Sequence, residues 1–229
     1  MDVLYCDNHI LVAVKPPNMP SQADASGDMD ALTELKEYVG IKYKKPGNVY
    51  LGLVHRLDRP AGGVMVFART SKAAARLGAQ FQEHAQGRKY LAVVEGEMRA
   101  PARLVDWLLK GADGMVRAVP EGTKDAKRAE LVTAPVAARG GLTLTDVELM
   151  TGRAHQIRVQ HANVGHPLWG DMRYGNGMPG RQLALWAYSL SFRHPTRHET
   201  LTFQSRPPRS GAWEEFCDII DERFPDAQG

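Results

Sequence analysis

The amino-acid sequence predicts an α+β fold with an antiparallel sheet. Short apolar runs rich in Val and Leu, bounded by Gly, Pro and charged turns, follow one another between residues 89 and 150. Helical spacing of apolar residues is confined to segments on either side of that region. Consecutive strands without intervening helices pair antiparallel, because parallel neighbours need a long crossover.

The N-terminal third is expected to contain a hairpin, a helix and two further strands. Residues 3–6 and 10–15 are apolar runs around an Asp-Asn turn, and a proline-rich stretch follows them. Residues 21–28 are polar and predict a loop, whereas 31–43 have the apolar spacing of a helix. Residues 51–54 and 64–68 then predict two buried strands.

The rest of the chain alternates a few helices with many strands. A helix capped by Ser71 is expected to end at Gly87, and a second helix, over 151–161, is expected to begin at Thr151. The first turn of that second helix would offer free backbone N–H groups to a phosphate. Residues 166–180 predict a loop. Strands are expected at 89–95, 104–109, 116–119, 129–136, 142–150, 183–192 and 200–203, and a terminal helix at 212–223.

Composition excludes several classes of protein. With 43% hydrophobic and 24% charged residues, the 229-residue chain is typical of a globular domain. No run approaches the roughly 20 apolar residues of a membrane span, and no secretion signal is recognisable. Cys6 and Cys217 lie too far apart in sequence to suggest a disulfide framework. We therefore expect a cytoplasmic monomer with no membrane association.

The sequence also lacks the usual signatures of cofactor chemistry. The histidines and cysteines show no zinc-type spacing, and neither a phosphate-binding loop nor a dinucleotide-binding glycine motif is present. No serine stands in a nucleophile elbow. We expect neither a metal nor a cofactor.

Asp58 is the strongest candidate for a catalytic group. It stands in a charged tip between the strands at 51–54 and 64–68, close to His55, Arg56 and Arg59. A loop Asp more often caps a turn or pairs with a neighbouring arginine in solvent. Three other short polar segments, at 15–17, 88–90 and 151–153, also interrupt apolar stretches, and they argue against that interpretation of Asp58.

Two residues of those polar segments could act with Asp58. Arg153 could pair with the carboxylate and hold it ionised. Tyr90 could be a core tyrosine whose hydroxyl group contacts water, or its ring could face a planar ligand. The net charge of +3 is compatible with nucleic-acid binding, although the lysines at 42–45 alone suggest only a solvated surface.

Residues 55–58, His-Arg-Leu-Asp, are followed two residues later by Ala-Gly-Gly. This tip resembles the signature loop of the RluA-type pseudouridine synthases. Further blocks similar to that family occur in the same order over about residues 3–203. They are Lys-Pro-Pro at 15–17, Arg-Lys-Tyr-Leu-Ala-Val-Val-Glu-Gly at 88–96, Thr-Gly-Arg-Ala-His-Gln-Ile-Arg at 151–158, Gly-His-Pro-Leu-Trp-Gly-Asp at 165–171, Leu-Ala-Leu at 183–185 and His-Pro at 194–195.

The resemblance implies isomerisation of a uridine in rRNA or tRNA to pseudouridine, without metal or cofactor. It implies an α+β fold in which a mixed, mainly antiparallel sheet is flanked by helices, with a central active-site cleft. Asp58, Tyr90 and Arg153 match the family's catalytic positions, with Tyr90 stacking on the target base and Arg153 pairing with Asp58. Expected RNA-binding residues are Arg56, His55, Arg59, Lys15, Lys89, His155 and Arg158.

The sequence has no internal repeat and no low-complexity linker, so we expect a single catalytic domain over 1–229, with a core at about 3–205, a terminal helix at about 212–223 and no separate N-terminal RNA-binding domain. The chemistry agrees with the function that the resemblance implies. Cleavage of a glycosidic bond builds positive charge at C1′, which a carboxylate stabilises. A nucleic-acid N-glycosidase and a non-catalytic RNA-binding module are the alternatives. A glycosidase would release free uracil, whereas isomerisation conserves mass.

Overall fold

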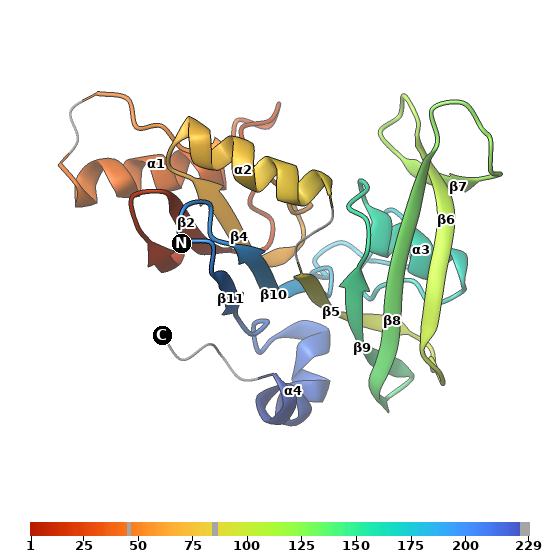
Figure 1. The fold of residues 1–229 in the computed structure, drawn as a ribbon. Coiled ribbons are helices and arrows are strands. Elements are labelled where there is room, and N and C mark those ends of the chain that lie inside the picture. The colour runs from red at the N-terminus through yellow and green to blue at the C-terminus, as the bar shows by residue number, and fades with distance from the viewer. Residues whose placement is uncertain (45–46, 84–86, 225–229) are drawn as a thin grey trace. The chain divides into compact units, whose positions relative to one another are not determined.

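The computed structural model describes residues 1–44, 47–83 and 87–224 of the 229-residue chain (Figure 1). The chain forms two compact units. Unit 1 comprises residues 1–87 and 187–205, and unit 2 comprises residues 88–186 and 206–225. The single-domain organisation expected from the sequence stays a prediction.

Unit 1 is a sheet with two helices. Its strands lie in the order β1-β2-β4-β10, with β11 paired to β10 and β3 paired to β4. The pairs β1/β2, β2/β4, β3/β4 and β10/β11 are antiparallel. The elements are β1 (Asp2–Cys6), β2 (Ile10–Lys15), α1 (Ala31–Lys42), β3 (Gly52–Leu53), β4 (Gly62–Ala68), α2 (Ser71–Gln82), most of β10 (Leu185–Arg193), and β11 (Thr200–Gln204).

The core of unit 1 follows the alternation of its strands. Every residue of β4 is buried, so both faces of this strand are covered. One face packs its Val64 and Val66 with Ile10 and Val12 of β2 against Leu77 of α2. Helix α2 begins after Thr70, whose hydroxyl accepts the N–H of Ala73. Thr70 rather than Ser71 is therefore the N-cap.

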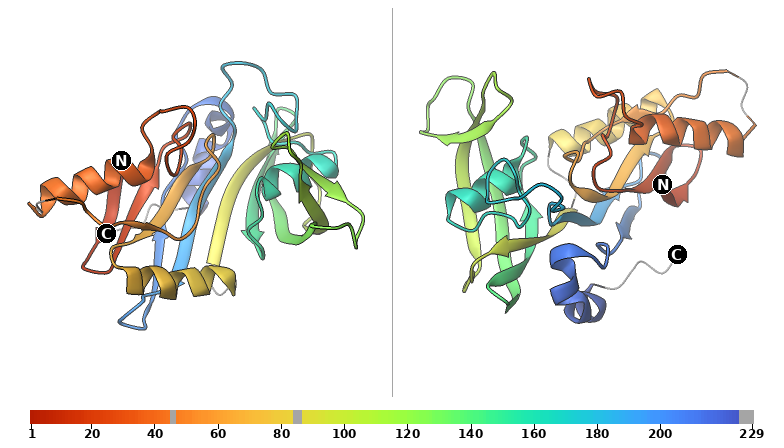
Figure 2. Two further views of the ribbon diagram at one scale, coloured as in Figure 1. Left: turned by 90° about the horizontal axis from the view of Figure 1, so that it is seen from above. Right: turned by 180° about the vertical axis from the view of Figure 1, so that it is seen from behind.

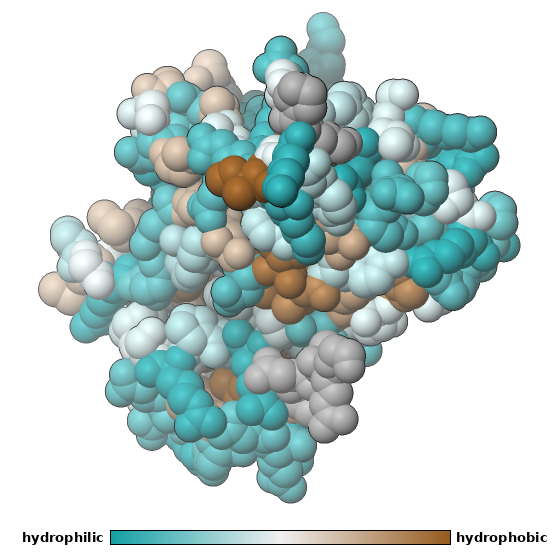
Figure 3. Space-filling view, turned by 90° about the vertical axis from the view of Figure 1, so that its left-hand side faces the viewer, coloured by the Kyte–Doolittle hydropathy of each residue, from teal (hydrophilic) through white to brown (hydrophobic). Residues whose placement is uncertain are grey.

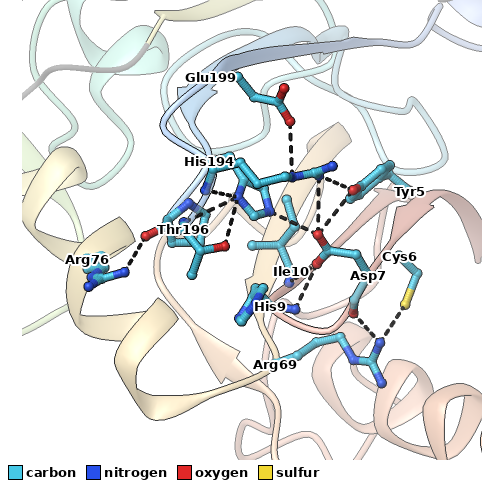
Figure 4. Close-up of polar contacts among 12 residues, drawn as sticks. Tyr5, Cys6, Asp7, His9, Ile10, Arg69, Arg76, His194, Thr196 and Glu199 are labelled. Atoms are coloured by element: carbon cyan, nitrogen blue, oxygen red, sulfur yellow. Dashed lines mark hydrogen bonds and ion pairs between the residues drawn. The ribbon is translucent and has the colours of Figure 1, made fainter.

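A network around Asp7 ties the first hairpin to the end of β10 (Figure 4). One carboxylate oxygen of Asp7 accepts the backbone N–H groups of His9 and Ile10, at 2.7 and 2.8 Å. The other accepts from Nε2 of the buried His194 at 2.9 Å. Nδ1 of His194 accepts the N–H of Arg197, so the imidazole hydrogen must lie on Nε2. The hairpin turn is thus held by a defined tautomer of one buried histidine.

Unit 2 contains five antiparallel strands, in the order β5-β9-β8-β6-β7. Helix α3, in teal, lies against these strands (Figure 2, right). Its Val159 packs with Leu108, Val116 and Ala129 of β6, β7 and β8. The elements are β5 (Gly87–Glu95), β6 (Ala102–Lys110), β7 (Val116–Val119), β8 (Lys127–Arg139), β9 (Leu142–Leu149), α3 (Gln156–Asn163), a 3₁₀ helix η1 (Gly211–Phe216) and α4 (Cys217–Arg223).

The α+β prediction with a mainly antiparallel sheet is confirmed, but three local predictions besides the Ser71 cap are wrong. Helix α3 begins at Gln156, and its N-cap is His155 in the left-handed conformation rather than Thr151. Helix α2 ends at Gln82, so Gly87 does not end it and instead opens β5. The terminal helix is 3₁₀ over its first six residues. Residues 84–86, which were included in the expected α2, lie outside the described part of the chain.

The face of the molecule in Figure 3 is mainly hydrophilic, with small hydrophobic patches. Large apolar side chains that are exposed, such as Ile41 and Met29, occur singly in the sequence. In the described part of the chain, no helix is long and apolar enough to span a membrane.

We predict that His161 makes the stability of unit 2 sensitive to acid. Its ring is fully buried, with Nδ1 at 2.8 Å from the Ile157 carbonyl and Nε2 at 3.1 Å from the Thr133 hydroxyl. Burial lowers the pKa of His161 to about 4, from an ordinary value of 6.5. The unfolded chain therefore takes up this proton first, and stability falls as the pH drops from about 6.5 to about 4.

Urea unfolding at pH 7 and pH 4.5 measures this effect. In the wild type, His161 should lower the free energy of unfolding by roughly 3 kcal/mol between pH 7 and pH 4.5, since one pKa unit corresponds to about 1.4 kcal/mol. His161→Gln should lack this pH-dependent contribution. His198→Asn, at an exposed left-handed position, is the matched control. Equal pH dependence in the wild type and His161→Gln would contradict the assignment.

Candidate active site

The loop that carries Asp58 is held by side chains of a second segment, residues 15–21. The Ser21 hydroxyl donates to the Leu57 carbonyl at 2.9 Å and accepts the Leu57 N–H at 3.2 Å. The Ala61 N–H donates to the Asp58 carbonyl at 3.0 Å and closes a turn. Leu57 and Ala61 are buried on either side of the half-buried Asp58. The backbone on both sides of the carboxylate is therefore fixed.

Lys15 is the second anchor of this loop. Its side chain is fully buried, and Nζ donates to the carbonyls of Pro16, Met19 and Arg59 at 2.9, 2.8 and 3.2 Å. Burial lowers the pKa of Lys15 to about 7, while the neighbouring Asp58 carboxylate acts in the opposite direction. Lys15 thus supports the loop internally, and its expected role as an RNA contact stays a prediction.

His55 is also used inside unit 1. Its Nε2 accepts the backbone N–H of Val66 at 3.0 Å, just beyond the residues that pair β3 with β4. The ring stacks on Phe81 of α2, with centroids 4.5 Å apart. One ring nitrogen and one ring face are therefore occupied by the protein. The expected RNA contact of His55 stays a prediction.

The two arginines of the tip differ in their surroundings. Arg56 is exposed. Arg59 is held by the polar loop 21–28, where it pairs with Asp24 and Asp28 and donates to the Ser26 hydroxyl at 2.9 Å. An RNA phosphate would compete with two carboxylates for Arg59. The exposed Arg56 has no such competition from these carboxylates.

The start of β5 presents its side chains to alternate faces of the sheet. Arg88 and Tyr90 are buried, whereas Lys89 between them is half-buried. Lys89 lies opposite Glu148 of β9 in the strand register. Lys89 and Tyr90 therefore do not point to the same face, and a ligand that stacks on Tyr90 would not also meet Lys89 there.

The turn before α3 is organised by one buried glutamine that sequence reasoning missed. Oε1 of Gln156 accepts the Thr151 hydroxyl at 2.8 Å and the Arg153 N–H at 3.0 Å. Its Nε2 donates to the Glu130 carbonyl at 3.0 Å. The signal was visible in the resemblance, since Gln156 stands inside the block at 151–158. Gln156 thus holds the turn that precedes α3.

Arg153 lies in this turn, three residues before α3. Its Nε donates to the Arg128 carbonyl at 3.0 Å, and its side chain is half-buried. Asp58 belongs to unit 1, whereas Tyr90 and Arg153 belong to unit 2. The pairing of Arg153 with Asp58, and a site that joins them with Tyr90, stay predictions.

The remaining two candidates are engaged within unit 2. Nε and Nη2 of the buried Arg158 donate to the two carboxylate oxygens of Asp171, at 2.8 and 2.7 Å. His155 places Nδ1 at 2.6 Å from the Tyr174 hydroxyl. Arg158 is therefore an internal ion-pair partner, and its expected RNA contact stays a prediction.

Asp171 is the other residue that sequence reasoning missed. Burial acts to raise the pKa of Asp171, but the Arg158 guanidinium and the N–H groups of Arg173 and Tyr174 outweigh it and hold this pKa below its usual range.

Within the described residues, no three His, Cys, Asp or Glu side chains are grouped to hold a metal ion.

We predict that Lys15→Met loosens the Asp58 loop. The change leaves three carbonyls without their donor, and each unsatisfied buried group costs about 1–3 kcal/mol, partly offset by removing a buried charge. The amide of Ala61 should exchange its hydrogen faster, because the turn that it closes loses its anchor at Arg59. Hydrogen exchange with mass spectrometry measures this. Lys42→Met, at an exposed helix position, is the control, and unchanged exchange at Ala61 would argue against the anchor.

The comparisons with known proteins agree with the motifs. The family model described as RNA pseudouridylate synthase matches residues 9–163. The chain is 32% identical over 214 residues to the "Uncharacterized RNA pseudouridine synthase YhcT" of Bacillus subtilis, covering 91% of this chain and 69% of that protein. It is 28% identical to "Ribosomal large subunit pseudouridine synthase D" of Zymomonas mobilis, covering 91% and 70%.

Two further comparisons complete the set. "Ribosomal large subunit pseudouridine synthase C" of Escherichia coli is 32% identical over 218 residues, covering 89% of this chain and 65% of that protein. The solved structure of "Human RNA Pseudouridylate Synthase Domain Containing 4" has a TM-score of 0.75 at 21% identity, covering 91% of this chain and 89% of that one. This likeness supports the fold. With its motifs, the family match and these relatives, the chain belongs to the RNA pseudouridylate synthase family and is an RNA-modifying isomerase.

Proposed function

We propose that the chain converts specific uridines of large-subunit ribosomal RNA to pseudouridine, with Asp58 as the catalytic carboxylate. The choice of RNA is supported by two relatives over about nine-tenths of this chain, whose names give the ribosomal large subunit. The choice of residue is supported by the fixed backbone around Asp58 in the signature loop. Transfer RNA is the alternative substrate.

The surroundings of Asp58 suit isomerisation better than hydrolysis. A carboxylate stabilises the positive charge that develops at C1′ as the bond to uracil breaks, or helps remove the C2′ proton in a glycal route. A hydrolase would need a second carboxyl group to activate water. An isomerase must instead exclude water while the base rotates, and the buried Leu57 and Ala61 beside Asp58 favour that.

Tyr90, Arg153 and Arg56 have the side chains that the other steps require. A tyrosine ring stacks on an unpaired base, and a guanidinium holds a carboxylate ionised. Flipping a uridine out of an RNA stack costs a few kcal/mol, and an inserted side chain such as the exposed Arg56 fills the space that the base leaves. We propose these roles for the three residues.

Several finer expectations belong to the same proposal. We expect a cytoplasmic enzyme, since RNA substrates are there and both Cys6 and Cys217 are free thiols. We also expect a monomer that needs neither metal nor cofactor. Activity that survives chelation on an RNA short enough to need no Mg²⁺ would support this.

We predict that Asp58→Asn abolishes pseudouridine formation. The amide is neutral and a poor nucleophile, so turnover should fall by about 1,000-fold or more, while folding and RNA affinity stay nearly unchanged. Tritium release from 5-³H-uridine RNA measures turnover. Mapping of pseudouridine in ribosomal and transfer RNA, from cells with and without the protein, identifies the substrate.

The controls separate the alternatives. Free uracil in the product mixture would indicate a glycosidase, and a biological role that persists in Asp58→Asn would indicate a binding module. Arg99→Gln, which changes an exposed arginine, should leave turnover unchanged. Sites lost only from transfer RNA would overturn the ribosomal assignment.

We predict that Arg153→Lys binds RNA almost normally but loses most of its single-turnover rate. A lysine keeps the charge but cannot make the paired hydrogen bonds of a guanidinium. Single-turnover rates at saturating enzyme measure the chemical step once binding is complete. A wild-type rate in Arg153→Lys would mean that Arg153 contacts a phosphate and does not orient Asp58.

A further inference from the structure

Arg88 carries a buried and unsatisfied hydrogen-bonding edge. The residue is only 8% exposed, and its Nε and Nη2 atoms are buried without a hydrogen-bond partner in the described part of the chain. Burial lowers the pKa of Arg88, the neighbouring Tyr90 acts in the opposite direction, and the Arg153 charge lowers it further. A buried arginine is normally paired, because an unpaired charge in the interior is costly.

The edge without a hydrogen-bond partner is the one with which arginine binds oxyanions. Nε and Nη2 lie on one side of the guanidinium and form its bidentate fork. In the same unit, Arg158 uses these two atoms to hold both carboxylate oxygens of Asp171. Arg88 presents the same fork with no acceptor.

The turn at 151–153 leaves room for this guanidinium. A Cβ atom on Gly152 would lie 2.3 Å from Nη1 of Arg88, so a side chain there would push the guanidinium out of its present position. Arg153, the next residue, brings a second positive charge. A neutral acceptor would satisfy the hydrogen bonds only, whereas an anion would also relieve the repulsion between the two arginines.

We propose that Arg88 is a binding residue for a phosphodiester of the RNA substrate, toward which the buried side chain turns so that Nε and Nη2 can donate to it. RNA carries one such group per nucleotide, in a geometry that arginine holds with two hydrogen bonds. The inference deepens the proposed function, since it rests on RNA as the substrate. It adds a phosphate-binding site, formed by Arg88 next to Gly152 and Arg153, to the catalytic residues.

If the charge of Arg88 has no partner in the free protein, removing it should stabilise the protein and weaken RNA binding. Arg88→Met removes a charge that has no partner in the free protein, so the thermal midpoint should rise by roughly 2–4 °C. The same variant should bind a single-stranded oligouridylate about 10-fold or more weakly, with a salt slope smaller by about 0.7. Arg88→Lys should fall between Arg88→Met and the wild type. Arg99→Gln is the control, since it removes one exposed positive charge.

A strand with neutral methylphosphonate linkages tests the anion. On that strand the wild type and Arg88→Met should bind equally. A difference that persists would mean that Arg88 contacts a base or sugar, and this would overturn the proposal. A lower thermal midpoint with unchanged binding would instead assign Arg88 to one of the chain's own carboxylates. These outcomes concern synthetic strands, so they are independent of whether ribosomal RNA proves to be the natural substrate.

Discussion

The structure depends on one constraint: irregular backbone that enters the core must have its N–H and C=O groups satisfied. Buried polar side chains meet this requirement at each place where the motifs leave regular structure. Lys15 and Ser21 bind the backbone of the Asp58 loop, and Gln156 binds the turn that carries Arg153. The segments proposed for catalysis therefore owe their shape to residues that need not touch the substrate.

The same constraint separates what could be predicted from what could not. The hairpin, α1 and the strands of both units follow from local patterns, because strands and amphipathic helices have fixed periods. The start of α3 could not be predicted, since Thr151 has the chemistry of an N-cap but uses its hydroxyl on Gln156 and Glu130. That choice depends on strand β8, which is distant in sequence.

The candidate site divides in the same way. Motif resemblance suggests Asp58, Tyr90 and Arg153 as catalytic residues, and it groups Lys15, Arg56 and Arg158 as if every basic residue faced RNA. Burial distinguishes them: Lys15 and Arg158 are interior, whereas Arg56 is exposed. A sequence gives the charge of a side chain, whereas the fold determines whether that charge meets solvent or a carboxylate such as Asp171.

Neither unit is a continuous stretch of chain, and this affects the order in which the protein can assemble. Strands β1 to β4 leave the ribosome first, but β10 and β11 of the same unit follow only after residues 88–186 have been made. At about 5–20 residues per second, that interval lasts roughly 5–20 s. Strands β5, β6, β7, β8 and β9 are all made within that interval, so they can pair with one another before β10 is made. During synthesis, one edge of β4 therefore stays unpaired until its neighbour β10 has been made. In that period the unpaired backbone groups of β4 can pair with a strand of another chain.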